Sequence, residues 1–504
     1  MNEPKEFPIK RSFIEETFPV KEISEESARE KNIRHGHIST LHIWWARRPL
    51  ASSRATAYAA LIPVPDTIEE IEKKKNFIAE LCKWENSLNP TYIEKARKDI
   101  KQALGYTPRV LDPFAGGGAI PLEALRLGCE TYASDYNPVA VLILKAVLEY
   151  PQKYGRRKGK GIEDFDLKEE EQDEQNEEKY DFVADVKKWG EWVLNEAKKE
   201  IGRFYPAEKD GSIPVGYIWA RTIPCQNPSC NAEIPLMRQF WLAKKSNKKV
   251  ALYPYVEDKE VKFKVVGDGY EPLPDGFDPS KGTVKGAIAT CLVCGSTVDA
   301  NTTRKLFQEG KAGERMVAVV LHYPKKKGKF YRVASEVDLE VYKQAEVYLA
   351  EKVEELRKKW GIEPIPDEPT PESKGKGAER AFSVRNYGLN TWGDLFNLRQ
   401  KLALITFVDK VREAYRRMIE EGYEEEYAKA VVTYLGLTVS RLADKDANLV
   451  VYNVVGEKIE HVFGRQALPM TWDYIELNVF SGANGDWISN LSWVLRSVEH
   501  CSKL

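Results

Sequence analysis

A glycine-rich turn between an apolar run and a helical pattern constrains the fold of this chain more than any other stretch. Val110 and Leu111 have the pattern of the end of a buried strand, and a tight turn follows from Asp112 to Gly118, with three consecutive glycines at positions 116 to 118. Residues 120–127 then have the spacing of an amphipathic helix, which Gly128 ends. Because consecutive glycines let the backbone approach a ligand and adopt positive φ, this order predicts a ligand site at the carboxyl edge of a parallel sheet.

The other residues of the turn narrow the class of ligand. A dinucleotide fingerprint needs a glycine where Pro121 stands, so a pyrophosphate cradle is disfavoured. A second predicted strand, 130–134, ends at Asp135, about 20 residues past the glycines, where a carboxylate can accept hydrogen bonds from both ribose hydroxyls. The alternative is a glycine turn in some other α/β protein. The predicted cofactor-binding residues are Asp112, Pro113, Phe114, Gly116, Gly117, Gly118, Asp135 and Asn137.

The composition limits the possible partners. The 504 residues suggest two to four domains. With 76 basic and 77 acidic residues, any nucleic-acid surface has to be local. No apolar run approaches the ~20 residues that span a membrane, and the first residues lack a signal-peptide core. We therefore expect a cytoplasmic protein without a membrane partner, and its many Lys and Glu residues are typical of thermophiles.

The segment 33–52 combines histidine, tryptophan and arginine. Three of the six histidines, at positions 35, 37 and 42, lack neighbouring cysteine or carboxylate partners, so packing or hydrogen bonding is favoured over a metal site. Arg47 and Arg48 adjoin Trp44 and Trp45. These arginines can contact the bases or phosphates of a nucleic acid, or they can equally hold a helix against the sheet.

Two close cysteine pairs predict a metal centre. Cys225 and Cys230 form one pair, and Cys291 and Cys294 form the other. Four thiolates can surround a zinc ion tetrahedrally, and such a closed site is structural. Residues 231–290 separate the pairs and include strand-like stretches at 248–256 and 261–266, which indicates a zinc ribbon with a β insertion. The alternative is four unligated buried thiols.

Basic residues near position 330 alternate with aromatic ones. The basic residues are Lys325, Lys326, Lys327 and Arg332, and they are candidates for nucleic-acid contact. The alternative is a hairpin tip with solvated lysines.

Local signals outline the remaining helices. The helices expected in the N-terminal half span 51–61, 68–84 (with Asp66 as N-cap), 90–104, 139–148 and 182–201. Ser335 and Asp338 form a capping box for a helix that continues to Trp360. Further on, Thr391 to Asp394 are expected to cap a long helix, and two more helices are expected at 424–442 and 487–500.

The segments 33–52, 112–118, 392–400 and 470–478, together with the four cysteines, resemble the zinc-ribbon-containing adenine-specific DNA methylases. The resemblance follows nearly the whole chain. It implies S-adenosylmethionine (SAM) as cofactor, a structural Zn²⁺ ion, a Rossmann-like sheet and methyl transfer to adenine N6 of DNA. An RNA amino-methyltransferase is the alternative enzyme, since the motif at 112–118 and the Asp/Asn/Ser-Pro-Pro-Tyr/Phe motif of such enzymes are shared with RNA enzymes.

One element implied by the resemblance is missing. Amino-methyltransferases of this kind hold the acceptor amine with a motif Asp/Asn/Ser-Pro-Pro-Tyr/Phe, and this chain contains no Pro-Pro pair. No catalytic residue is therefore assigned. We expect the N-terminal part of a methylase with an incomplete sheet. Three origins are open: a split gene, in which case a second polypeptide supplies the Asp-Pro-Pro-Tyr motif, a truncated gene, or a shortened form of a longer chain. A non-catalytic zinc-ribbon subunit that binds nucleic acid is the third possibility.

The predicted fold class is α/β: a Rossmann-like methyltransferase sheet with an inserted zinc ribbon and a helical C-terminal region. The expected segments are an N-terminal helical segment (1–105), a SAM-binding core (106–205) with an acidic insertion (161–179), a zinc ribbon with β insertion (206–334), a helix (335–363), a linker (364–380) and a helical region leading back to the core (381–504).

Overall fold

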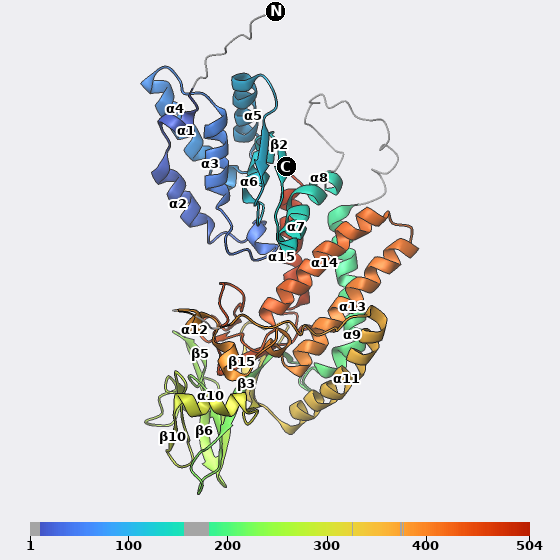
Figure 1. The fold of residues 1–504 in the computed structure, drawn as a ribbon. Coiled ribbons are helices and arrows are strands. Elements are labelled where there is room, and N and C mark those ends of the chain that lie inside the picture. Colours follow the sequence, from blue (N-terminus) through green and yellow to red (C-terminus); the bar gives the residue numbers. More distant parts are fainter. Residues whose placement is uncertain (1–10, 156–180, 325, 373–374, 376, 504) are drawn as a thin grey trace, which may run out of the picture. The chain divides into compact units, whose positions relative to one another are not determined.

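The computed structural model describes residues 11–155, 181–324, 326–372, 375 and 377–503. It divides into two compact units (Figure 1). Unit 1 comprises Met1–Lys188, Tyr423–Tyr434 and Trp493–Leu504, and unit 2 comprises Trp189–Gly422 and Leu435–Ser492. The chain contains both helices and sheets, as expected for the predicted α/β class, and the Rossmann-like sheet stays a prediction. The predicted acidic insertion, 161–179, lies outside the described residues, and the predicted domain boundaries stay predictions.

Unit 1 consists mainly of helices around one short sheet (Figure 1). Its helices are α1 (Phe13–Glu16), α2 (Val20–Glu30), α3 (Leu50–Leu61), α4 (Ile68–Leu81), α5 (Pro90–Leu104), α6 (Ala119–Arg126), α7 (Pro138–Leu144), α8 (Tyr150–Tyr154) and the start of α9 (Phe182–Ile201). The predicted helices are confirmed with one corrected cap. Thr67, not Asp66, caps α4, because the Thr67 hydroxyl accepts the amide hydrogen of Glu70.

The sheet of unit 1 is a parallel pair. Strand β1 (Arg109–Asp112) pairs with β2 (Glu130–Ala133), and α6 connects them. Val110 packs against the core formed by α3, α5 and α6. Within the described ranges, no further strand pairs with β1 or β2. The sheet of unit 1 is therefore a single strand–helix–strand unit.

A mixed-length antiparallel sheet lies at the centre of unit 2. Its strand order is β12 (Phe330–Val333), β11 (Gly313–His322), β3 (Ile213–Pro224) and β15 (Asp473–Leu477), and β4 (Glu233–Leu236) also pairs with β3. Helices α11 (Glu336–Trp360), α13 (Leu398–Glu420) and the unit 2 part of α9 run alongside one another (Figure 1). Lys352 and Lys410 both reach the carboxylate of Glu200 at 2.9 Å, which joins the three helices.

Three small sheets complete unit 2. They contain β5 (Trp241–Lys245), β6 (Lys248–Glu257) and β7 (Glu260–Gly267); β8 (Val284–Lys285), β9 (Ile288–Thr290) and β10 (Thr297–Val298); and β13 (Tyr452–Asn453) and β14 (Lys458–Ile459). Strands β6 and β7 confirm the strands predicted between the cysteine pairs. Helix α10 (Ala300–Gln308) follows β10.

The predicted cap at 391–394 is wrong. Helix α13 begins at Leu398, and Asn397 with Gln400 forms its capping box. Asp394 instead accepts the amide hydrogens of Asn390 and Thr391, which closes a separate turn. The capping box of α11 is confirmed. The last two predicted helices are also confirmed, as α14 (Glu425–Lys445) and α15 (Trp487–Cys501).

The sequence segments 392–400 and 470–478 converge on a buried polar network in unit 2. Arg399 and Glu476 are both buried and form an ion pair. The other carboxylate oxygen of Glu476 accepts hydrogen bonds from Trp219 at 2.7 Å and Asn397 at 3.0 Å. Because a buried carboxylate needs such partners, these segments have a structural role that joins α13 to the sheet.

Candidate functional site

The glycine turn connects β1 to α6 and is braced by two aspartates. Gly116 has φ 52° and Gly118 has φ 79°, values that favour glycine. One oxygen of Asp135 accepts the Gly116 amide hydrogen at 2.9 Å, and the other accepts that of Asn137 at 2.8 Å. Asp112 accepts the Phe114 amide hydrogen at 3.2 Å. Both carboxylates are therefore held at the carboxyl ends of the two parallel strands.

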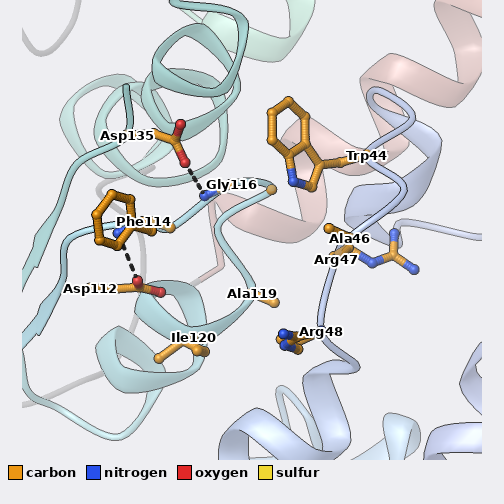
Figure 2. A pocket seen from close by; sticks show the side chains of 12 residues that line it. Trp44, Ala46, Arg47, Arg48, Asp112, Phe114, Gly116, Ala119, Ile120 and Asp135 are labelled. Atoms are coloured by element: carbon orange, nitrogen blue, oxygen red, sulfur yellow. Dashed lines mark hydrogen bonds between the residues drawn. The ribbon is translucent and has the colours of Figure 1, made fainter. Parts of the chain in front are cut away.

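The predicted cofactor residues fall into two groups. Asp112, Phe114, Gly116, Gly117 and Asp135 line a cavity of about 350 Å³ (Figure 2). The remaining three do not line it: Pro113, Gly118 and Asn137. The Asn137 side chain caps α7 by accepting the Val139 amide hydrogen at 2.9 Å.

The opposite wall of this cavity comes from residues 44–48, here called the strap. Trp44, Ala46, Arg47 and Arg48 line the cavity from that side (Figure 2). The strap lies so close to the turn that a Cβ atom on Gly116 would stand 2.5 Å from the indole nitrogen of Trp44. The glycines therefore admit the strap as well as a ligand, which no local sequence signal indicated.

The two strap arginines are placed differently. The Arg47 stem covers Gly117, and its guanidinium points away from the turn (Figure 2). Burial lowers the pKa of Arg47, an effect that Glu30 opposes and Arg34 reinforces. The Arg48 side chain is exposed and lies on the cavity side, beside Ala119 (Figure 2). Both arginines, predicted as nucleic-acid candidates, thus belong to the wall of the cavity.

The histidines near the strap take part in hydrogen bonding. His37 is fully buried, and its Nε2 atom lies 2.8 Å from the carboxylate of Glu30. Glu30 also accepts the amide hydrogens of Leu50 and Ala51 at 3.0 Å each, which fixes the start of α3 directly after the strap. Burial lowers the pKa of His37, so this histidine is neutral near pH 7. The hydrogen-bonding interpretation of His37 fits these contacts.

The four cysteines of unit 2 converge. Their sulfur atoms all lie within 4.8 Å of one another, with Cys225 Sγ 3.7 Å from Cys294 Sγ and Cys230 Sγ 3.8 Å from Cys291 Sγ. A tetrahedron with zinc–sulfur bonds of ~2.3 Å has edges of about 3.8 Å. The donor set therefore fits a metal ion bound by four thiolates, which leaves no open coordination position.

Each cysteine pair lies on a turn that ends in a residue with positive φ. Asn231, at 49°, follows Cys230, and Gly295, at 76°, follows Cys294. Two comparable turns thus present the sulfurs, although the first pair has four intervening residues and the second has two. The longer spacing of the first pair does not prevent the four sulfur atoms from converging.

The candidate nucleic-acid residues near position 330 belong to unit 2, whereas the residues that line the cavity belong to unit 1. The Arg332 guanidinium is half-buried and bonds to Glu208 at 2.5 Å and to Asp338 at 2.6 Å. Lys326 lies 4.7 Å from the ring centre of Tyr323, and Lys327 is exposed. Lys325 lies outside the described residues. Nucleic-acid contact by these side chains stays a prediction, and the ion pairs of Arg332 favour a structural role for that residue.

A glycine turn braced by aspartates at the ends of parallel strands is typical of the cofactor sites of α/β proteins. Residues 94–215 match the family of D12 class N6 adenine-specific DNA methyltransferases. The predicted resemblance to adenine-specific DNA methylases is therefore confirmed, and this match implies SAM use. Residues 17–86 match a family described as a protein of unknown function (DUF1156). No curated protein and no solved structure matched the chain.

In the described part of the chain, no helix combines the length and apolar character needed to cross a bilayer.

Proposed function

We propose that this chain binds SAM in the cavity between the glycine turn and the strap, and that it serves methyl transfer to the exocyclic amine of adenine in DNA. The observation that carries the proposal is the position of the cavity. It lies at the turn of the strand–helix–strand unit that the methyltransferase family match covers. At about 350 Å³ its volume lies within the range of small-molecule sites, about 300–1,000 Å³.

The chemistry of the cavity wall suits the parts of SAM. Each carboxylate oxygen of Asp135 accepts one backbone hydrogen bond and retains a lone pair, so both can accept from a ribose diol. Trp44 and Phe114 offer aromatic faces for a purine. Asp112 adds negative charge toward a ligand that carries an ammonium and a sulfonium group. When bound, SAM supplies the activated methyl group; the residues of this chain bind and orient it.

Asp135→Ala is expected to lower SAM affinity at least about 100-fold, because two hydrogen bonds to a charged acceptor are lost. Isothermal titration calorimetry with SAM and S-adenosylhomocysteine measures the loss. Asn137→Ala is the matched control, since it removes the cap of α7 and leaves the Asp135 carboxylate in place. Unchanged affinity in Asp135→Ala, with the fold intact by circular dichroism, would contradict the proposed cofactor site.

The uncovered face of β1 and β2 supports a second polypeptide as the source of the acceptor site. Leu111 and Tyr132 are paired across the two strands on one face and are 68% and 49% exposed. The outer side of α7 adds Val139 at 43% and Leu142 at 40% exposed. Parallel sheets are normally covered on both faces, so this face has the composition of an interface. We propose that the partner adds strands and helices here and supplies the Asp-Pro-Pro-Tyr motif.

Replacing Tyr132 by the photo-crosslinker p-benzoylphenylalanine is expected to link the chain to that partner in its native host. The same crosslinker at Ile68, another exposed apolar residue of unit 1, is the matched control and should not link to it. Support requires that Leu111→Asp abolishes the crosslink and that the purified partner restores methyl transfer to DNA. Crosslinks only within the chain or to a second copy would contradict a separate partner.

The same reconstitution distinguishes the remaining functions. Tritiated SAM offered with duplex DNA, tRNA or rRNA shows which acceptor gains the label. Labelling of RNA alone would establish the amino-methyltransferase alternative. If the chain binds nucleic acid but does not bind SAM, the non-catalytic zinc-ribbon subunit would be established. The intact braced turn and its cavity favour a SAM-dependent enzyme over the non-catalytic subunit, and the family match favours DNA over RNA as the acceptor.

A further inference from the structure

The strap contains an arginine whose guanidinium has no ionic partner in the described part of the chain. Arg48 lines the cavity and is exposed. In the described part of the chain, no hydrogen bond or ion pair of the Arg48 side chain is found. By contrast, the nearby buried arginines Arg54 and Arg126 are both bonded to Glu123. A guanidinium that lines a cavity without a partner of its own is suited to an anionic group of the ligand.

Arg48 and Asp135 lie at different ends of the cavity lining (Figure 2). Asp135 belongs to the end of β2, whereas Arg48 lies beside Ala119 at the start of α6. A ligand held by its ribose at Asp135 can extend along the glycine turn toward Arg48. The far end of SAM is an amino acid, and its only anionic group is a carboxylate.

The backbone reinforces Arg48 at this end. Ala119 and Ile120 are the first residues of α6, so their amide hydrogens have no acceptor within the helix. Both residues line the same cavity as Arg48. Amide groups at a helix start favour a negative charge, and together with the guanidinium they form a site for a carboxylate.

We propose that Arg48 binds the carboxylate of the amino-acid moiety of SAM, which makes the strap part of the cofactor site. The inference rests on the proposed function, since SAM is the ligand. It assigns a role to a segment of the match of unknown function, residues 17–86. Arg47 does not share this role, because its guanidinium points away from the turn (Figure 2).

The test compares SAM with decarboxylated SAM, which lacks only the carboxylate. Arg48→Met keeps an aliphatic stem and removes the guanidinium. It is expected to weaken SAM binding about 10- to 100-fold and decarboxylated SAM less than about two-fold, as for the loss of a charge-assisted hydrogen bond. Arg109→Met is the matched control, since Arg109 is an exposed arginine of unit 1 that does not line the cavity, and it should change neither affinity more than about two-fold. Calorimetry gives the affinities, and thermal melts establish that each variant is folded.

The outcomes separate this inference from the proposed function. If the wild-type chain binds neither compound, the proposed cofactor site itself fails. If it binds SAM and Arg48→Met leaves SAM affinity unchanged, or weakens both compounds equally, the role of Arg48 is overturned and the SAM site stands. Weaker binding of duplex DNA with unchanged SAM affinity would instead identify Arg48 as a phosphate contact, which also overturns the inference.

Discussion

Cys291→Ser is expected to abolish metal binding by unit 2 and to unfold the region around the four cysteines, while the cofactor cavity of unit 1 persists. The loss should be large because structural zinc contributes about 10–16 kcal/mol of apparent binding energy in small zinc-finger peptides. The local core around the cysteines is small. It comprises β4, β8, β9, β10, α10 and the side chains of Tyr387 and Trp472. A core of this size depends on the ion for its stability.

Three measurements test this result. Elemental analysis should find about one zinc ion per wild-type chain and none in Cys291→Ser. Hydrogen exchange should show lost protection in β8, β9 and β10. SAM affinity should stay within about two-fold, because every residue that lines the cavity belongs to unit 1.

Cys129→Ser is the matched control for the metal site. Cys129 is a buried cysteine of unit 1 outside the four-sulfur cluster. This variant should retain the full zinc content. Equal zinc content in Cys291→Ser, or a wild-type chain without metal, would contradict a structural four-cysteine centre.

The features predicted correctly from the sequence are those whose chemistry is local. The glycine turn, the position of Asp135 just after β2 and the extents of most helices depend on residues that are close in sequence. The convergence of the four cysteines is not local, yet it was predictable because two cysteine pairs with short spacing are typical of metal-binding turns.

The strap was not predictable as a wall of the cavity. Trp44 lies more than 70 positions before Gly116 in the sequence, and no periodic spacing of hydrophobic residues indicates that the two segments are in contact. The interpretation of Arg47 and Arg48 left two alternatives open for the same reason.

The predicted cap at 391–394 was wrong for another reason. Asp394 has the right chemistry, but its carboxylate meets the amides of Asn390 and Thr391 before the helix starts.

The burial of a charged residue in α6 could likewise not be predicted from the sequence. Glu123 lies in an amphipathic pattern, where an acid is expected to face solvent, yet it is fully buried. Its two oxygens accept from Arg54 Nε and Arg126 Nη1 at 2.5 Å each. Arg54 belongs to α3 and Glu123 to the helix that follows the glycine turn. This network joins the segment of unknown function to the methyltransferase segment within one unit.

Glu123→Gln is therefore expected to lower the free energy of unfolding of unit 1 by about 3–5 kcal/mol, since removal of one partner leaves buried charges uncompensated. The remaining partners cannot compensate: Arg54 also donates to the Leu81 carbonyl, and Arg126 to His500 at 2.7 Å. Burial and the neighbouring Arg126 lower the pKa of His500 to about 2, so it stays a neutral acceptor. Urea denaturation monitored by circular dichroism measures the change.

Glu130→Gln is the matched control, because it removes the carboxylate of an exposed pair, Arg109–Glu130, in the same unit. Exposed pairs contribute about 0–1 kcal/mol, so this variant should unfold near the wild-type urea concentration. The combined replacement Arg54→Met, Glu123→Leu and Arg126→Met should recover much of the stability lost in Glu123→Gln, since no buried charge then lacks a partner. Equal destabilisation by Glu123→Gln and Glu130→Gln would show that the buried ion pairs of Glu123 do not stabilise unit 1. The two matched segments would then be joined by apolar packing between α3 and α6 alone.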